Sequence, residues 1–380
     1  MFILVACDKF RGSLTAVEAN DAVLAGLSAS ALDATAQAVA IADGGEGTLD
    51  ALSGPATERM TAVVAGPFGA PVEADWLVDR PTRRAIIEVA AVAGHASVRG
   101  RGYDPDVATS AGIGELVRAA LDAGARRLVV TLGGSVTVDG GAGALEELGA
   151  TFLDGDGRVL GRPAGRALLD VRRVELAGLD PRLADATFEL AADVDNPLTG
   201  PDGAAAVFGP QKGVACADVA AFDAALAHLD RMLADARGST PLAHTPFAGA
   251  AGGLMVGLSA AAPTVARDGF ALVSDHQDLD ARIARADLVV TGEGSLDDQS
   301  LAGKGPIAVA RAAAARGVPA IAFAGRLAAD DEALRACGVV AAFALARGPA
   351  SLEEALASAA GDLQQTARAA FDLIAAARRA

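Results

Sequence analysis

Residues 287–305 read DLVVTGEGSLDDQSLAGKG, and the interpretation of the whole chain starts from this stretch. The apolar run 288–290 predicts a buried strand. The glycines on either side of Glu293 predict that the strand stops there, because glycine lets a backbone turn sharply and approach a ligand closely. Lys304 follows, and residues 306–316 predict a helix. Charged groups between a strand and a helix lie at the carboxyl end of a sheet, where open α/β sheets bind ligands, and the helix start adds N–H donors suited to phosphate.

The same GEG triplet occurs near the start of the chain. Residues 2–6 predict a first strand and residues 16–27 a helix. A second strand is predicted at 37–42, and it ends in DGGEGT at 43–48. GEG plus a hydroxyl residue therefore follows a predicted strand twice, which suggests two loops at the same edge of one sheet.

The order of the predicted elements indicates two domains. The turn-rich stretch GPFGAP at 66–71 is a candidate boundary. Strand–helix alternation resumes from residue 287, with further strands at 318–323 and 339–345. The fold class is therefore α/β, with a discontinuous doubly wound domain and a second α/β domain inserted into it, and a cleft is expected between them. The expected bounds are 1–66 plus 280–380 for the first domain and 67–279 for the second.

Composition narrows the classes of partner. Acidic residues outnumber basic ones, 48 to 32, and no basic run appears, so nucleic acid is not expected as a partner. The three cysteines are far apart, which favours a reduced, cytoplasmic protein. Residues 247–266 are uncharged and long enough to span a bilayer. They are mostly Ala and Gly, however, which insert into membranes only weakly. A buried helix is expected there, and no membrane partner.

Several nucleotide-binding and catalytic signatures are missing. Lys304 is followed by Gly305 rather than Ser or Thr, so there is no Walker A loop. No complete GxGxxG is present, which opposes a nicotinamide-dependent dehydrogenase. What remains is a set of loops rich in Gly, Asp, Ser and Lys. Glycine loops cradle anions, Mg²⁺ takes one or two carboxylates plus phosphate oxygens, and phosphoryl transfer needs mainly positioning and charge neutralisation.

Seven ordered blocks resemble the bacterial glycerate kinase family, type I. They are Asp8 with Gly12-Ser13-Leu14, ADGGEGT at 42–48, GGS at 133–135 with DGGAG at 139–143, DNPLTG at 195–200, FGPQKG at 208–213, GAAGG at 249–253, and TGEG at 291–294 with Asp297, Gln299, Gly303 and Lys304. The resemblance implies ATP- and Mg²⁺-dependent phosphorylation of D-glycerate at its 2-hydroxyl, giving 2-phosphoglycerate. It also implies a flavodoxin-like domain interrupted by a second α/β domain. The alternatives are a kinase of another small sugar acid, phosphorylation at the 3-hydroxyl, and a non-catalytic sugar-acid sensor.

Three positions depart from the family pattern. The family usually has Ser where Lys9 stands, Lys where Arg11 stands, and Asn where Val138 stands. Arg and Lys both carry a positive charge, but only Arg presents a fork of donors. Substrate choice among small hydroxy acids is therefore left open, as is the oligomeric state, for which a homo-oligomer is one candidate.

Candidate residues are assigned to four roles. The catalytic candidates are Asp8, Asp195 and Lys304. The candidates for binding the substrate are Lys9, Arg11, Ser13, Asp43, Gly44, Gly45 and Glu46. The candidates for binding phosphate or nucleotide are Gly133, Gly134, Ser135, Asp139, Lys212, Gly292, Glu293, Gly294 and Gln299. The metal candidates are Asp193 and Asp297. Which carboxylate is the base and which binds metal stays open at this point.

Overall fold

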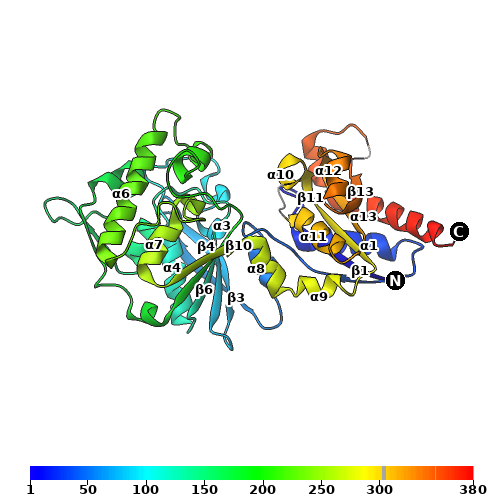
Figure 1. The fold of residues 1–380 in the computed structure, drawn as a ribbon, viewed down its shortest axis with the longest axis horizontal. Coiled ribbons are helices and arrows are strands. Elements are labelled where there is room, and N and C mark those ends of the chain that lie inside the picture. Colours follow the sequence, from blue (N-terminus) through cyan, green and yellow to red (C-terminus); the bar gives the residue numbers. More distant parts are fainter. Residues whose placement is uncertain (302–304, 347, 380) are drawn as a thin grey trace. The chain divides into compact units, whose positions relative to one another are not determined.

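The computed structural model describes residues 1–301, 305–346 and 348–379, apart from the side chain of Gln299, and it divides the chain into two compact units (Figure 1). Unit 1 comprises Met1–Asp43, Asp50–Leu52 and Phe270–Ala380. Unit 2 comprises Gly44–Leu49 and Ser53–Gly269. Unit 1 is therefore built from both ends of the chain, and most of unit 2 lies between them in the sequence.

Unit 1 is an α/β unit with a five-stranded sheet. Its strands are β1 (Phe2–Cys7), β2 (Thr35–Ala38), β11 (Leu288–Leu296), β12 (Ala320–Leu327) and β13 (Val339–Ala344). Its helices are α1 (Ala16–Ser28), α8 (Gly269–His276), α9 (Leu279–Ile283), α10 (Asp298–Leu301), α11 (Gly305–Ala314), α12 (Asp331–Ala336) and α13 (Leu352–Ala377), while α2 (Thr48–Leu52) is shared between the units.

All neighbouring strands of this sheet are parallel, in the order β13-β12-β11-β1-β2. Numbered within the unit, that order is 2-1-3-4-5, which is the flavodoxin-like arrangement with its switch point between β1 and β11. The predicted α/β class is confirmed. The strand pairing also shows that two strands come from the start of the chain and three from its end, as the alternation indicated.

Two hydrophobic cores cover the two faces of the unit 1 sheet. On one face, Leu4 and Val289 pack with Ile307 of α11. On the other, Val5 and Val290 pack with residues of α1 and α13, including Leu363 and Phe371. Because both faces are buried there, β1, the start of β11 and most of β12 are nearly continuous apolar runs rather than alternating ones, which made them recognisable from sequence, whereas the edge strand β2 is largely exposed.

Capping boxes start both helices of the second core. The Thr15 hydroxyl accepts from the N–H of Glu18, whose carboxylate accepts in return from Thr15 N, at 2.8 Å. Ser351 and Glu354 repeat this arrangement at the start of α13. In both, a hydroxyl residue is followed three positions later by Glu, which is the sequence pattern that predicts a capping box.

The expected end of the strand at Gly292 is wrong, because β11 continues through the GEG triplet to Leu296. A Cβ on Gly292 would lie 2.5 Å from the carbonyl oxygen of Phe323, and one on Gly294 would lie 2.8 Å from the amide nitrogen of Arg11. Glycine is needed here for close backbone approach, as predicted, but the approaching backbone belongs to neighbouring segments of unit 1.

Unit 2 contains a mixed six-stranded sheet and a small two-stranded one. The strands are β3 (Glu58–Ala65), β4 (Pro71–Asp79), β5 (Arg84–Glu88), β6 (Arg127–Thr131), β7 (Thr151–Leu153), β8 (Arg173–Glu175), β9 (Thr187–Ala192) and β10 (Thr264–Asp268). The helices are α3 (Val89–Ala93), α4 (Ala111–Asp122), α5 (Ala142–Glu147), α6 (Val219–Arg237) and α7 (Leu254–Ala261). The order in the larger sheet is β10-β9-β6-β5-β4-β3, with β5, β6, β9 and β10 parallel and β3, β4 and β5 antiparallel.

The unit boundaries differ from those expected at residues 66 and 280. β3 pairs with β4 from Glu58↔Val78 to Ala65↔Pro71, so residues before 66 already belong to unit 2. The Gly- and Pro-rich stretch is the turn of this hairpin, in which Gly66 N donates to the carbonyl of Ala70 at 2.7 Å. Gly and Pro are enriched both in tight hairpin turns and in linkers between domains. The composition of residues 66–71 therefore could not show which of the two this stretch forms.

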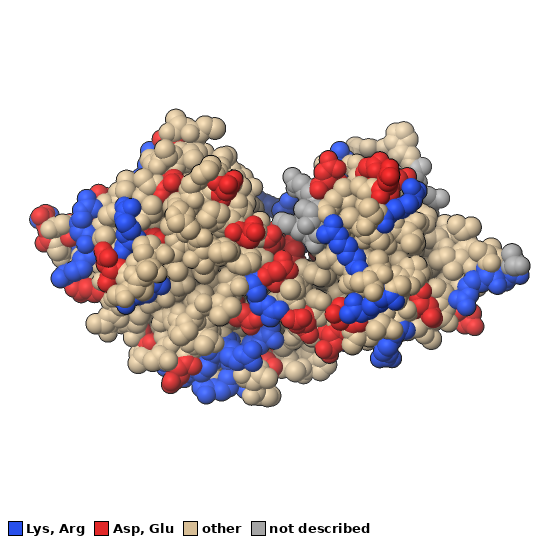
Figure 2. Space-filling view, viewed as in Figure 1, with Lys and Arg blue, Asp and Glu red and all other residues tan. Residues whose placement is uncertain are grey.

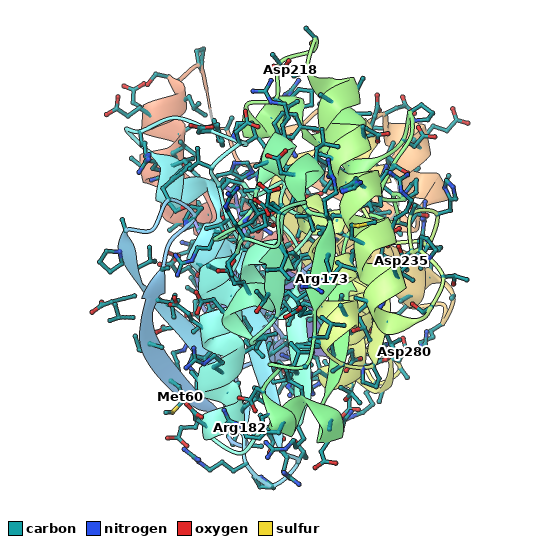
Figure 3. All side chains as sticks on the ribbon, turned by 90° about the vertical axis from the view of Figure 1, so that its left-hand side faces the viewer. Met60, Arg173, Arg182, Asp218, Asp235 and Asp280 are labelled. Carbon is teal, nitrogen blue, oxygen red and sulfur yellow. The ribbon has the colours of Figure 1, made fainter. Side chains whose placement is uncertain are left out.

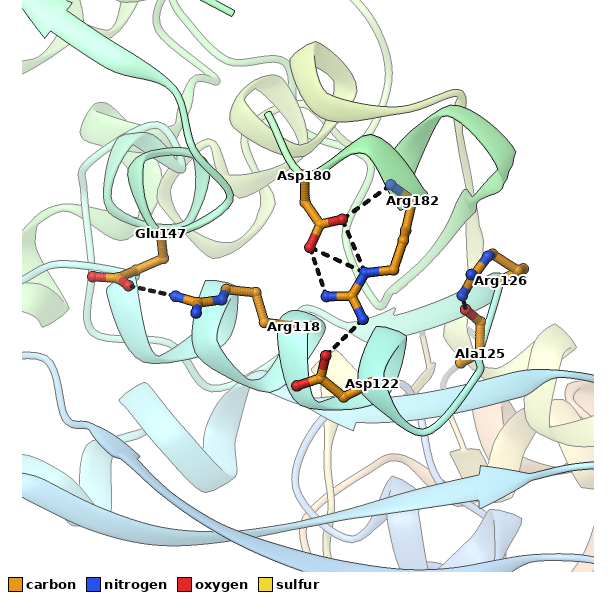
Figure 4. A network of polar contacts seen from close by, with 7 residues as sticks. All are labelled: Arg118, Asp122, Ala125, Arg126, Glu147, Asp180 and Arg182. Atoms are coloured by element: carbon orange, nitrogen blue, oxygen red, sulfur yellow. Dashed lines mark hydrogen bonds and ion pairs between the residues drawn. The ribbon is translucent and has the colours of Figure 1, made fainter. Parts of the chain in front are cut away.

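The surface of unit 2 carries ion pairs between arginine and acidic side chains. Arg182 donates to Asp122, the last residue of α4, and to Asp180, each at 2.6 Å (Figure 4). Such exposed pairs contribute about 0–1 kcal/mol each. The viewed face in Figure 2 carries acidic and basic side chains side by side, as a chain with 48 acidic and 32 basic residues predicts.

Residues 247–266 do not form the single buried helix that was expected. They contain a short 3₁₀ turn at Ala250–Gly252, the eight-residue α7, and most of β10. The buried position of α7 is as expected. Within the residues that the structure describes, none of the helices combines the length and the apolarity needed to cross a membrane.

Candidate functional site

Asp8, Lys9 and Asp43 lie together in unit 1, the first two directly after β1 and the third in the segment that follows β2. Asp8 directly follows β1, and its N–H donates to the carbonyl of Gly292 in β11 at 2.9 Å. Lys9 Nζ lies 3.7 Å from Asp8 Oδ1 and 3.7 Å from Asp43 Oδ1. Asp8 is only 6 % exposed. Burial raises the pKa of Asp8 to about 6, against the opposing effect of Lys9, so this carboxylate is close to titrating at neutral pH.

Glu293 adds a second perturbed carboxylate at this edge. Burial raises its pKa to about 7, a hydrogen bond from Ser300 opposes the shift, and the charges of Asp8, Asp297 and Asp43 add to it. Its Oε1 is buried and has no hydrogen-bond partner among the described residues. The effect of these three charges on Glu293 shows that its carboxylate shares one electrostatic environment with theirs.

Other residues of unit 1, among them the candidates Arg11 and Ser13, differ in their surroundings. Gly305, at the start of α11, approaches Asp8 so closely that a Cβ there would lie 3.0 Å from Asp8 Oδ2. Arg11 is exposed, and Ser13 donates to the carbonyl of Phe10 at 3.0 Å. Lys304 and the side chain of Gln299, a catalytic and a nucleotide-binding candidate respectively, lie outside the described residues.

The carboxylate cluster fits a bound divalent cation. Mg²⁺ takes one or two protein carboxylates and completes its shell with water and phosphate oxygens. Asp297 accepts from Ser295 Oγ at 3.2 Å and from Ser300 N at 3.4 Å, which fixes its orientation beside Glu293. No group of three or more His, Cys, Asp or Glu side chains within the described part of the chain is arranged as a ready-made metal site. The residues present therefore suit a cation that arrives with its own phosphate ligands.

Replacing Glu293 with Gln is expected to raise the melting temperature in the absence of divalent cations. The folded-state pKa of Glu293 lies above the unfolded value, at about 7. Its contribution to stability is therefore fully present below about pH 4.5 and is lost as the pH rises through about 7. Gln has the same shape and no charge, so the variant should gain on the order of 2 kcal/mol at about pH 8, or a few degrees.

Thermal melting at about pH 8 and about pH 5 measures this effect. Glu353→Gln, on the exposed side of α13, serves as the matched control because it removes the same charge from solvent. The gain for Glu293→Gln should shrink as the pH falls. A gain that is the same at both pH values, or no gain, would show that the Glu293 carboxylate is not destabilised by its surroundings.

In unit 2, polar residues lie at or just after the ends of the parallel strands β5, β6 and β9. Glu88, Thr131 and Ala191 are aligned across β5, β6 and β9. Gly133, Gly134 and Ser135 therefore follow β6 at the same sheet edge where Asp193 follows β9. The structure brings these predicted phosphate and metal candidates to neighbouring strand ends, in the position where ligands bind to open α/β sheets.

Glu88 is a site-edge residue that the sequence did not single out. It is 6 % exposed, and its carboxylate accepts from Gly47 N at 3.3 Å and from Leu49 N at 3.1 Å. Gly133 N donates to the carbonyl of Gly44 at 3.1 Å, and a Cβ on Gly133 would lie 2.5 Å from Gly45 Cα. The first GEG loop is thus fixed to the strand ends of unit 2. The sequence signal for Glu88 was a carboxylate at the end of an apolar strand. Its hydrogen-bond partners, Gly47 and Leu49, lie about forty residues earlier in the chain.

Lys212 is buried behind the Gly133–Ser135 loop. Its Nζ donates to Ser135 Oγ at 2.8 Å and to the carbonyl of Thr137 at 3.1 Å. Lys212 is 3 % exposed and Ser135 is 4 % exposed. Burial lowers the pKa of Lys212 to about 7, and the charge of Asp139 opposes this shift. A lysine in this state exchanges its proton readily near neutral pH.

Asp139 was a candidate for binding phosphate or nucleotide, and the structure places it inside unit 2. It is fully buried, and its carboxylate accepts from Ser110 N, Ser110 Oγ, Gly141 N and Gly143 N at 2.7, 2.8, 3.1 and 3.2 Å. Burial raises its pKa, and these hydrogen bonds oppose the shift. The carboxylate therefore binds the backbone at the start of α4 and α5.

The metal candidate Asp193 and the catalytic candidate Asp195 remain near the surface. Asp193 is half-buried and Asp195 is exposed. The backbone carbonyl of Asp195 accepts from Phe247 N at 3.1 Å, and that of Asn196 accepts from Gly249 N at 3.0 Å. These bonds fix the backbone and leave the roles of both side chains as predictions.

Comparison with known proteins gives a consistent picture. The model of the glycerate kinase family matches residues 3–375. A glycerate kinase from Bacillus subtilis (strain 168) is 42 % identical over 369 residues, which cover 97 % of this chain and 96 % of that relative. A glycerate 2-kinase from Escherichia coli (strain K12) is 37 % identical over 370 residues, again with 97 % and 96 % coverage. A crystal structure from Salmonella typhimurium LT2, bearing the name glycerate kinase 2, covers 100 % of both chains at 37 % identity with a TM-score of 0.85.

Proposed function

Because the chain belongs to the glycerate kinase family, we propose that it transfers the γ-phosphoryl group of ATP to the 2-hydroxyl of D-glycerate, releasing 2-phosphoglycerate and ADP. The observation that carries this proposal is the buried Asp8 beside Lys9 and Asp43, at the carboxyl end of a flavodoxin-like sheet. A relative named glycerate 2-kinase supports the position of the new phosphate ester.

Asp8 is assigned the role of general base. With a pKa of about 6 it is ionised above neutral pH, yet it is more basic than an ordinary carboxylate. Its Oδ1 accepts from Lys9 N at 2.6 Å, so Oδ2 is the oxygen assigned to the proton. The 2-hydroxyl oxygen of glycerate attacks the γ-phosphorus, the bond to the bridging oxygen breaks, ADP leaves, and the hydroxyl proton passes to Asp8.

Lys9 and Arg11 are assigned to the glycerate carboxylate. Lys9 already forms ion pairs with Asp8 and Asp43. These pairs weaken the attraction that its ammonium group can exert on the carboxylate of a bound substrate. Arg11 is exposed and presents a planar fork of donors that matches a carboxylate. Ser13 and Asp43 are the further substrate candidates of unit 1, and the Gly44-Gly45-Glu46 loop is the candidate of unit 2.

The nucleotide phosphates are assigned to Gly133, Gly134 and Ser135, whose loop presents backbone N–H groups and a hydroxyl. Glu293 and Asp297 would hold Mg²⁺, with Asp193 as a further candidate. Bound Mg²⁺ supplies neutralisation of the charge on the phosphate oxygens. The buried Oε1 of Glu293, which lacks a partner among the described residues, supports this assignment.

Phosphorus NMR of the reaction mixture tests the proposed function. Purified protein should release ADP only when ATP, Mg²⁺ and D-glycerate are all present, and the product resonance should be that of 2-phosphoglycerate. L-Glycerate and D-lactate serve as control acceptors. Absence of glycerate-dependent ADP release would contradict the activity, whereas a 3-phosphoglycerate resonance would contradict only the position of phosphorylation.

A further inference from the structure

Lys212 touches the proposed phosphate loop through the side chain of Ser135. The ammonium nitrogen lies 2.8 Å from Ser135 Oγ and is buried, while Gly134 of the same loop is exposed. In the proposed site, a phosphate on the loop takes the backbone N–H groups of the glycines and the hydroxyl of Ser135, and Lys212 lies behind that hydroxyl.

The hydrogen-bonding capacity of Lys212 and Ser135 restricts the direction in which the Ser135 hydroxyl hydrogen can point. An ammonium has three N–H donors and no acceptor, so a protonated Lys212 can only donate to Ser135 Oγ. The hydroxyl hydrogen of Ser135 must then point away from Lys212. A neutral amine has a lone pair, so after Lys212 loses its proton it can accept from Ser135, and the hydroxyl hydrogen turns toward the interior.

We propose that the protonation state of Lys212 sets the direction of the Ser135 O–H bond, and thereby the affinity of the Gly133–Ser135 loop for phosphate. Lys212 is then a positioning residue that acts through Ser135. The inference rests on the proposed function, because it assumes that this loop holds the nucleotide phosphates.

The surroundings of Lys212 place the transition in an accessible range. Burial lowers its pKa to about 7, and Asp139 is the charged group that opposes the shift. On the side of Gly213, Tyr103 approaches the Lys212 segment, and its hydroxyl lies 3.0 Å from His95 Nδ1. Below about pH 7 the ammonium directs the hydroxyl hydrogen outward and phosphate binds tightly. Above about pH 7 the neutral amine draws the hydrogen inward and phosphate binds more weakly.

Dissociation constants of Mg-ATP, measured without glycerate between about pH 6 and about pH 9, test the inference. The wild-type value should weaken by about tenfold over this range, as for loss of one hydrogen bond to a charged group. Ser135→Ala should bind more weakly at low pH and lose this dependence. Lys212→Arg keeps a permanently charged donor, so its affinity should also stay flat with pH.

The ratio of wild-type to Ser135→Ala affinity is the readout, because the titration of ATP itself is common to both proteins. A ratio that falls with pH supports the inference. A pH dependence unchanged by Ser135→Ala would overturn it, because Lys212 would then act directly on the ligand. Failure of the wild type to bind Mg-ATP at any pH would overturn the proposed function and this inference with it.

Discussion

Replacing Asp8 with Asn is expected to lower kcat by about 10²–10⁴-fold while the protein remains folded. The amide keeps the shape of the side chain but cannot accept the hydroxyl proton. Asp8 is 6 % exposed, and its charge is held in an unfavourable setting that raises its pKa to about 6. Removing that charge therefore relieves a destabilising term, so the melting temperature should be retained or raised.

The pH profile of kcat checks the role of Asp8 independently. The base must be ionised to work, so wild-type kcat should fall as the pH drops through about 6 and decrease about tenfold per pH unit below it. Asp21→Asn, which neutralises an exposed carboxylate on α1, is the matched control and should keep both kcat and the profile. A near wild-type kcat for Asp8→Asn would show that Asp8 is not the general base, and Asp195 would then be the first alternative.

Replacing Asp139 with Ala is expected to lower the free energy of unfolding by about 3 kcal/mol or more. Four donors, from Ser110, Gly141 and Gly143, point at its carboxylate inside unit 2. Each buried donor left without an acceptor costs about 1–3 kcal/mol. The loss also removes the negative charge at the start of α4, where a helix favours it.

Chemical denaturation followed by circular dichroism measures this loss of stability. Asp235→Ala, on the exposed surface of α6, is the matched control and should change the free energy of unfolding by about 0.5 kcal/mol or less (Figure 3). If Asp139→Ala kept wild-type stability but lost nucleotide binding, the carboxylate would be a ligand-binding group, as the sequence suggested, rather than a support for the backbone.

Local patterns in the sequence determined many elements of the fold. The capping boxes at Thr15 and Ser351 and the apolar strand runs depend on neighbours within a few residues, so their signals were complete in the sequence. Apolar residues at helical spacing also run along α13, where Ala359, Leu363, Ala367 and Phe371 are buried but Leu352, at the start of the helix, is exposed. The family blocks also identified candidate residues, because each block lies within a short segment of the chain.

Other features depended on contacts between distant segments. The GEG triplet at 292–294 continues a strand because the backbones of Phe323 and Arg11 approach it, which its own letters do not encode. The triplet at 45–47 is held by Glu88, and the role of Asp139 depends on Ser110, 29 residues earlier in the chain.

The sequence by itself determined the α/β class, the joining of both chain ends in one α/β unit, and the glycerate kinase family. Only the tertiary structure decided which carboxylates are buried and which backbone groups they accept from, and hence the raised pKa values of Asp8 and Glu293 and the lowered pKa of Lys212. The physical reason is that desolvation and hydrogen bonding act through space. Asp8 and Glu293 influence each other because β1 and β11 are paired, although 285 residues separate them in the chain.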